Sequence, residues 1–121
     1  RWGKTVLVWL WQARPALALL ENLLAAGEEP LAILGALTRQ VRTTWQVKEW
    51  FRAGKSVEEI ARILRRPPFA VETLAATANS LAPATLAHAL TRCWEAERRL
   101  KSGGRPRPEL SVLVADLCGA G

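Results

Sequence analysis

The feature that most constrains the fold is a series of apolar stripes with helical spacing, separated from one another by proline and glycine. The first stripe consists of Leu17, Leu20 and Leu24. It follows Pro15 and stops at Gly27. Proline suits the first turn of a helix, where its missing N–H is not needed, and glycine suits the residue just past the end. A chain divided in this way is expected to fold into helices joined by short turns.

The second stripe is the longest and predicts a helix of some twenty residues. Pro30 stands at its start behind two glutamates, which favour the positive end of a helix, and Gly54 ends it. The apolar positions expected to face the core are Leu34, Leu37, Val41, Trp45 and Phe51, with Trp50 also inside. This helix is expected to be the main core element.

A short third helix is predicted between Ser56 and the two prolines Pro67 and Pro68. Ser56 followed by Glu59 three residues later is the signature of a capping box, in which each residue satisfies the other's backbone N–H. The apolar face is expected to comprise Ile60, Ile63 and Leu64. The prolines then open a fourth helix, whose inward residues are expected to be Phe69, Leu74 and Ala78.

Two further helices complete the prediction. One begins near the sequence SLAP at residues 80–83 and runs to Lys101, with Leu86, Leu90, Cys93 or Trp94, and Leu100 on its seam. The other follows a linker-like stretch, KSGGRPRP, and carries Leu110, Leu113, Val114 and Leu117. We therefore expect an all-α fold, a compact bundle of six to seven helices forming one domain over residues 1–121. Residues 1–13 are expected to be a linker or a first short helix.

Composition narrows the class of protein. The chain has 17 Lys and Arg against 11 Asp and Glu, a net charge of +6 that would attract phosphate or an acidic protein surface. Its longest early apolar run, VLVWLW, is far shorter than the ~20 residues that span a bilayer, so no transmembrane helix is expected. A membrane-surface helix at the N-terminus is a weaker option because residues 4–11 carry only one charge, and we expect no membrane partner. Cys93 and Cys118 are expected to be reduced thiols in the cytoplasm. Because the first residue is Arg1, we expect a piece of a longer protein.

The residues offer little for catalysis or for a cofactor. The tripeptides GKT at 3–5 and GKS at 54–56 resemble the end of a phosphate-binding loop, but Glu49 stands where the second site needs an upstream glycine. His88 and Cys93 lie five apart on a predicted helix and point about 140° from each other, so they form no local dyad. No metal-ligand spacing is present either. We expect a chain that is not an enzyme and binds no cofactor or small-molecule substrate.

Residues 54–71 raise the alternative of a helix-turn-helix that reads DNA. Arg62, Arg65 and Arg66 could contact phosphates, although a solvated basic edge is the preferred explanation. The start of the second helix, residues 67–71, carries Pro, Phe, Ala and Val and offers no donors to base edges. We therefore expect Pro67 through Val71 to be buried against protein, and a basic helical DNA-binding domain stays the alternative function.

Surface candidates for a protein interface come from arginine and tryptophan. Arg39 and Arg42 are three residues apart and share one face of the longest helix beside its apolar stripe, where they serve either solubility or a protein contact. The residues Trp2, Trp9 and Trp11 are too crowded to be buried together, and they could mark a docking surface.

Several stretches, taken together and in order, carry a family resemblance. They are LLAAGEEPLAILGALTRQVR, VKEWFRAGKSVEEIARIL, PPFAV, AERRLKSGG and LSVLVADLC. Between about Ala16 and Cys118 the chain resembles the C-terminal domain of the bacterial DNA polymerase III delta subunit, part of the sliding-clamp loader. The residues that match the family's motifs are Gly27, Glu28, Pro30, Arg39, Gln40, Arg42, Lys48, Pro68, Phe69, Lys101 and Gly103. The chain departs from the family at Glu97, where Asp is common, and in the Arg- and Pro-rich loop at 104–108.

The resemblance implies a helical collar domain with no ATPase chemistry of its own. In the family, such domains from delta, delta-prime and the gamma/tau-type motor subunits associate into a ring, while separate N-terminal domains engage the sliding clamp. It therefore implies an oligomerisation function, with DNA reached only through the complex. The candidate interface residues are Arg39, Gln40, Arg42 and Lys101. Glu97 and Lys101 are also expected to pair, because they are four residues apart with the acid first.

Overall fold

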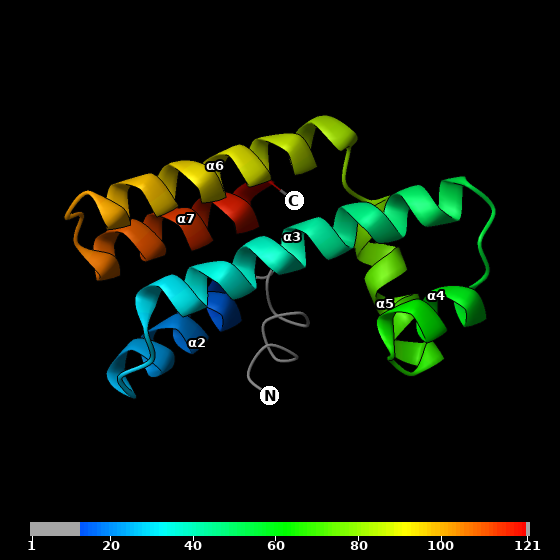
Figure 1. The fold of residues 1–121 in the computed structure, drawn as a ribbon, viewed down its shortest axis with the longest axis horizontal. Helices are drawn as coiled ribbons and strands as arrows, with labels where there is room; N and C mark the ends of the chain where they lie inside the picture. Colours follow the sequence, from blue (N-terminus) through cyan, green and yellow to red (C-terminus); the bar gives the residue numbers. More distant parts are fainter. Residues whose placement is uncertain (1–12, 121) are drawn as a thin grey trace.

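The computed structural model describes the backbone of residues 13–120 and the side chains of residues 16–117. This part of the chain folds into helices joined by short turns and contains no strand, which confirms the all-α prediction (Figure 1). The helices are α2 (Ala13–Ala25), α3 (Pro30–Arg52), α4 (Val57–Leu64), α5 (Pro68–Asn79), α6 (Pro83–Lys101) and α7 (Pro106–Ala120). Of the segment 1–13, only Ala13 lies within the described residues, where it begins α2.

Proline and glycine delimit the helices as the sequence predicts. Pro30, Pro68 and Pro83 lie in the first turn of α3, α5 and α6. Gly27 and Gly54 follow α2 and α3 with φ of 82° and 93°, a left-handed conformation that glycine adopts without the penalty a Cβ would impose. Short local signals of this kind act within one turn of chain, so they can be read without knowledge of the tertiary structure.

Helix α3 runs the length of the molecule, and the other helices pack at its two ends (Figure 1). Helices α6 and α7 lie side by side along its N-terminal part, with α2 packed against α7, while α4 and α5 lie at its C-terminal end. The larger core belongs to the first group and joins buried residues of α2, α3, α6 and α7. Its fully buried side chains include Ile33, Val41, Cys93, Leu110 and Leu117.

A second, smaller core joins α4 and α5 to the end of α3. It is built around Val47, Ile60 and Val71, each no more than 1% exposed. Lys48 adds a polar link across the same junction, because its Nζ donates a hydrogen bond of 3.2 Å to the carbonyl oxygen of Ala78 in the last turn of α5. A cation at that position also interacts favourably with the negative end of the helix dipole.

The predicted capping box is present at the start of α4. The Ser56 hydroxyl accepts a hydrogen bond of 3.1 Å from the backbone N–H of Glu59. In return the Ser56 N–H donates one of 2.9 Å to the Glu59 carboxylate. The pKa of the Glu59 carboxyl is lowered, most by the hydrogen bond from the Ser56 N–H and next by a hydrogen bond with the Ser56 side chain. The box sets the position at which the chain turns from α3 into α4.

The prediction that Pro67 through Val71 are buried is wrong for most of that segment. Pro67 and Pro68 are exposed, the Phe69 side chain is 71% exposed, and only Val71 is fully buried. The buried face of α5 starts at Val71 and repeats at Leu74, Ala75 and Ala78. Phe69 lies two residues before Val71, which is about 200° around the helix, so it faces solvent.

Three other assignments of faces also need correction. Ile63 is 49% exposed, because the buried arc of α4 passes through Ile60, Ala61 and Leu64. Trp45 and Trp50 are only half-buried at the edge of the cores. Trp2, Trp9 and Trp11 lie outside the described residues. The helix periods and the buried residues of α7 were therefore predicted correctly, while the widths of the buried faces of α3, α4 and α5 were not.

The stretch that resembled a linker is mostly structured. Helix α7 begins at Pro106, inside the RPRP sequence rather than after it. Arg107 pairs with Glu21 of α2, and Gly104 donates a backbone hydrogen bond of 2.7 Å to Arg99. A Cβ on Gly104 would lie 2.6 Å from the Arg99 carbonyl oxygen, so this turn requires glycine. The turn brings α7 back antiparallel to α6.

Candidate functional site

Three of the predicted interface residues lie together in a groove between α3 and α6. Arg39 and Arg42 come from the exposed face of α3, one turn apart, and Lys101 comes from the last turn of α6. All three line one hollow of about 560 Å³. The hollow is completed by Leu31, Leu34, Gly35, Thr38 and Glu97. We call this surface the α3–α6 groove.

The structure places the fourth predicted residue elsewhere. Gln40 is only 7% exposed and lies on the inward face of α3. One turn later Thr44, which is fully buried, donates a hydrogen bond of 2.7 Å to the Gln40 carbonyl oxygen. Gln40 therefore contributes to packing inside the domain and is not part of the exposed surface.

Some charged residues of the α3–α6 groove form ion pairs within the described residues, and others do not. The expected pair is present, with Lys101 Nζ 2.7 Å from Glu97 Oε2. None of the ion pairs found among the described residues involves Arg39, Arg42 or Arg98. The groove therefore presents guanidinium groups whose charge no carboxylate within the described part of this chain neutralises.

Trp94 is a surface residue that sequence reasoning missed. Its side chain is 70% exposed on α6, while its neighbour Cys93 takes the buried position on the seam. Two further hollows adjoin Trp94: one of about 210 Å³ extends the groove between α3 and α6, and one of about 510 Å³ is lined by α6 alone. The apolar pattern did not decide whether Cys93 or Trp94 takes the buried position on α6. The cysteine side chain is small enough to fit close against α3, and this difference in size could have distinguished the two residues.

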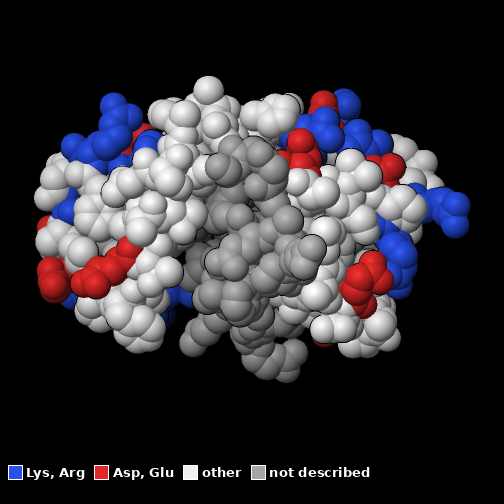
Figure 2. All heavy atoms as spheres, turned by 180° about the vertical axis from the view of Figure 1, so that it is seen from behind, with Lys and Arg blue, Asp and Glu red and all other residues white. Residues whose placement is uncertain are grey.

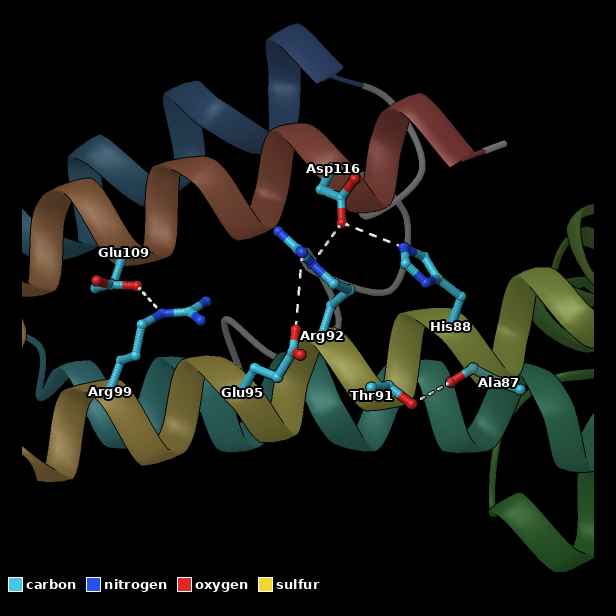
Figure 3. A network of polar contacts seen from close by, with 8 residues as sticks. All are labelled: Ala87, His88, Thr91, Arg92, Glu95, Arg99, Glu109 and Asp116. Carbon is cyan, nitrogen blue, oxygen red and sulfur yellow. Dashed lines mark hydrogen bonds and ion pairs between the residues drawn. The ribbon is translucent and has the colours of Figure 1, made fainter.

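The other polar side of α6 is already occupied. Arg92 Nε lies 2.8 Å from Asp116 Oδ2 of α7, and His88 Nε2 lies 3.7 Å from the same oxygen. Arg99 Nε lies 2.6 Å from Glu109 Oε1, which completes a row of contacts between α6 and α7 (Figure 3). The basic residues of this side thus hold two helices of the domain together, in contrast to those in the groove.

A second basic surface lies at the turn between α4 and α5. Arg62, Arg65 and Arg66 line a hollow of about 360 Å³ together with Pro68 and Glu58. Arg65 has φ of 55°, the left-handed conformation that closes α4. On the face shown in Figure 2, most of the visible charged side chains lie towards the two ends of the molecule.

The described residues show no arrangement typical of a metal or reactive-thiol site. No group of three or more His, Cys, Asp or Glu in this part of the chain could hold a metal ion. Burial raises the pKa of the Cys93 thiol, and a hydrogen bond with Thr38 only partly opposes that change. His88 lies on the α7 side, so it cannot activate this thiol. None of the described helices is long and apolar enough to cross a membrane.

Comparison with known proteins decides the family. The family model for the DNA polymerase III delta subunit, C-terminal domain, matches residues 8–115. This chain belongs to that family. The match spans the α3–α6 groove and the α4–α5 turn, so both surfaces lie within the delta C-terminal domain as the family defines it.

A solved structure shows the same fold. The Bacillus subtilis DNA clamp loader delta protein (YqeN) superposes with a TM-score of 0.73 at 21% sequence identity. The alignment covers 97% of this chain but only 34% of that one, so the delta-family domain described here corresponds to about a third of the Bacillus protein. No curated protein matches the chain.

Proposed function

We propose that this chain is the collar domain of a clamp-loader delta subunit, which assembles with other clamp-loader subunits through the α3–α6 groove. The observation that carries the proposal is the convergence of Arg39, Arg42 and Lys101 on one groove in a chain of the delta family. The partners are delta-prime-type and gamma/tau-type subunits in the cytoplasm. The domain itself is not catalytic, and contacts with the sliding clamp belong to other parts of the longer protein.

The proposed mechanism is side-by-side packing with a charged rim. Leu31, which is 39% exposed, supplies apolar surface in the groove above the buried Leu34, and Arg39, Arg42 and Lys101 stand around it. A carboxylate from a neighbouring subunit would pair with each free guanidinium, which binds planar anions bidentately. Such pairs select the correct partner and orientation more than they add affinity. Assembly would then hold the subunits together when their other domains separate.

The test is assembly of the full-length protein with its cognate clamp-loader subunits, purified together. The double substitution Arg39→Glu and Arg42→Glu should remove or strongly weaken co-elution in gel filtration. The matched control, Arg62→Glu and Arg66→Glu, changes the net charge equally at the other end of the molecule and should leave co-elution intact. Equal assembly of the two double variants would contradict the proposed interface.

A second candidate function is contact with nucleic acid at the α4–α5 turn. It is favoured by the exposure of Phe69 and by three arginines that form no ion pair within the described residues. Because residues 67–71 still offer no donors to base edges, such contact would be to phosphates and independent of sequence. Duplex DNA binding that falls steeply with salt, and that Arg62→Glu and Arg66→Glu abolish, would support it; binding unchanged in that variant would contradict it.

A further inference from the structure

Gly35 occupies a position in α3 that nothing within the described chain requires to be glycine. It lies inside a regular helix, where glycine is a poor choice, and its φ is not in the positive region. A Cβ added there would meet only Arg39 Nη1, at an ordinary 3.8 Å. Gly104, by contrast, has a backbone carbonyl in the way. The open space above Gly35 belongs to the α3–α6 groove.

A glycine facing open space in the middle of a helix permits another backbone to approach closely. The residues that line the groove on α3 recur at Leu31, Gly35, Thr38 and Arg42, along one face over about three turns. On α6 the hollows shared with α3 are lined by Thr91, Trp94 and Lys101, which also recur at helical spacing, and Arg98 lines an adjoining hollow formed by α6 alone. Two packed helices with such rows form a straight groove about 16 Å long, which suits a third helix.

Trp94 supplies the anchor for such a contact. Its side chain is 70% exposed and lies where two hollows meet, so an incoming apolar side chain could be enclosed on both sides of the ring. Tryptophan and arginine are the residues on which protein interfaces most often depend. The exposed indole shares one hollow with Arg42 and the adjoining hollow on α6 with Arg98, and neither arginine is in an ion pair found among the described residues.

The acids of the groove do not supply the missing partners. Glu97 pairs with Lys101, and Glu95 lies 3.7 Å from Arg92, which faces α7. The charge of the groove that no ion pair among the described residues neutralises is positive, so a partner surface complementary to it is acidic.

We propose that the α3–α6 groove receives one helix of a neighbouring clamp-loader subunit. The backbone of that helix lies close to Gly35, one of its apolar side chains packs on Trp94, and carboxylates at its edges pair with Arg39, Arg42 and Arg98. This inference rests on the proposed function and goes further, because it names the partner's secondary structure, its chemistry and the two residues of this chain on which the contact depends.

The experiment measures affinity and stability on the same variants of the full-length protein. Trp94→Ala should weaken binding to the cognate subunits at least about 30-fold. Gly35→Leu should weaken it about tenfold or more by keeping the helices apart, while its melting temperature stays equal to or above that of the wild type, because leucine favours the helix. The matched controls are Phe69→Ala, equally exposed at the other end of the molecule, and Ala18→Leu on the exposed face of α2.

Binding by Gly35→Leu and Trp94→Ala within about twofold of the wild type would overturn the inference. If Arg39→Glu with Arg42→Glu still disrupts assembly in that case, the proposed function stands without it. If the wild-type protein itself does not assemble with the subunits, the proposed function fails first.

A photo-crosslinker identifies the occupant directly. With p-benzoylphenylalanine in place of Trp94 in the assembled complex, the cross-link should map to a helix of a neighbouring subunit that carries Asp or Glu at its edges. A cross-link to a loop, to nucleic acid or to a second copy of this chain would overturn the inference.

Discussion

The hydrogen bond from Lys48 to Ala78 makes a prediction whose size can be worked out. Replacing Lys48 by Met keeps most of the apolar stem and removes the ammonium, which donates to the Ala78 carbonyl oxygen at 3.2 Å. A hydrogen bond from a charged donor is worth about 1.5–3 kcal/mol. The loss should fall below the top of that range, because the same oxygen also accepts from the Leu81 N–H at 3.2 Å and is not left without a partner. We expect Lys48→Met to lower the free energy of unfolding by about 1–2 kcal/mol.

The assay is urea denaturation of the 121-residue chain, followed by circular dichroism. A loss of that size shifts the midpoint by about 0.5–1 M when the slope is about 2 kcal/mol per M. Lys55→Met is the matched control, since Lys55 is also half-buried but its ammonium donates no hydrogen bond to the described residues. If both variants unfold at the wild-type midpoint, the hydrogen bond does not hold α5 to α3, and the reasoning is refuted.

Three more predictions concern local chemistry. Cys93, whose burial raises the thiol pKa, should react with a thiol reagent at neutral pH only after unfolding, in a variant whose other cysteine is Ser; rapid reaction of the folded chain would contradict this. Gly104→Ala should cost about 1–3 kcal/mol, because the new Cβ meets the Arg99 carbonyl oxygen, and an unchanged unfolding midpoint would count against it. The Ser56 hydrogen bonds lower the Glu59 pKa, so their stabilisation is present above the usual pKa of Glu and lost as pH falls through the lowered value. An NMR titration of Glu59 in the ordinary range would refute this.

The helix boundaries could be read from the sequence because their causes are local. Pro30 and Pro68 favour the first turn whatever surrounds them, and Ser56 finds its partner three residues away. The faces of short helices were harder to predict. In α4 and α5 the residues Ile63 and Phe69 belong to the apolar pattern but face solvent, because they lie outside the core that these two helices form with each other and with the end of α3. How much of a helix surface is buried depends on the helices packed against it, and the periodicity of the sequence alone does not reveal them.

The candidate site was predictable only in part. Arg39 and Arg42 share a face because of their spacing, which is a local property. Their meeting with Lys101 depends on how α6 packs on α3, and only the family resemblance suggested that the three belong together. Gln40 was grouped with its neighbours in the RQVR motif, although one residue along a helix is a rotation of about 100° and places it inside.

The central claim is that the α3–α6 groove becomes buried when this chain assembles with other clamp-loader subunits. Hydroxyl-radical footprinting with mass spectrometry measures it directly, by comparing side-chain oxidation in the free full-length protein and in the assembled complex. We predict that oxidation of Trp94, which is 70% exposed in the free domain, falls several-fold on assembly while that of Phe69 does not change. Equal oxidation of Trp94 in the two states would contradict the account.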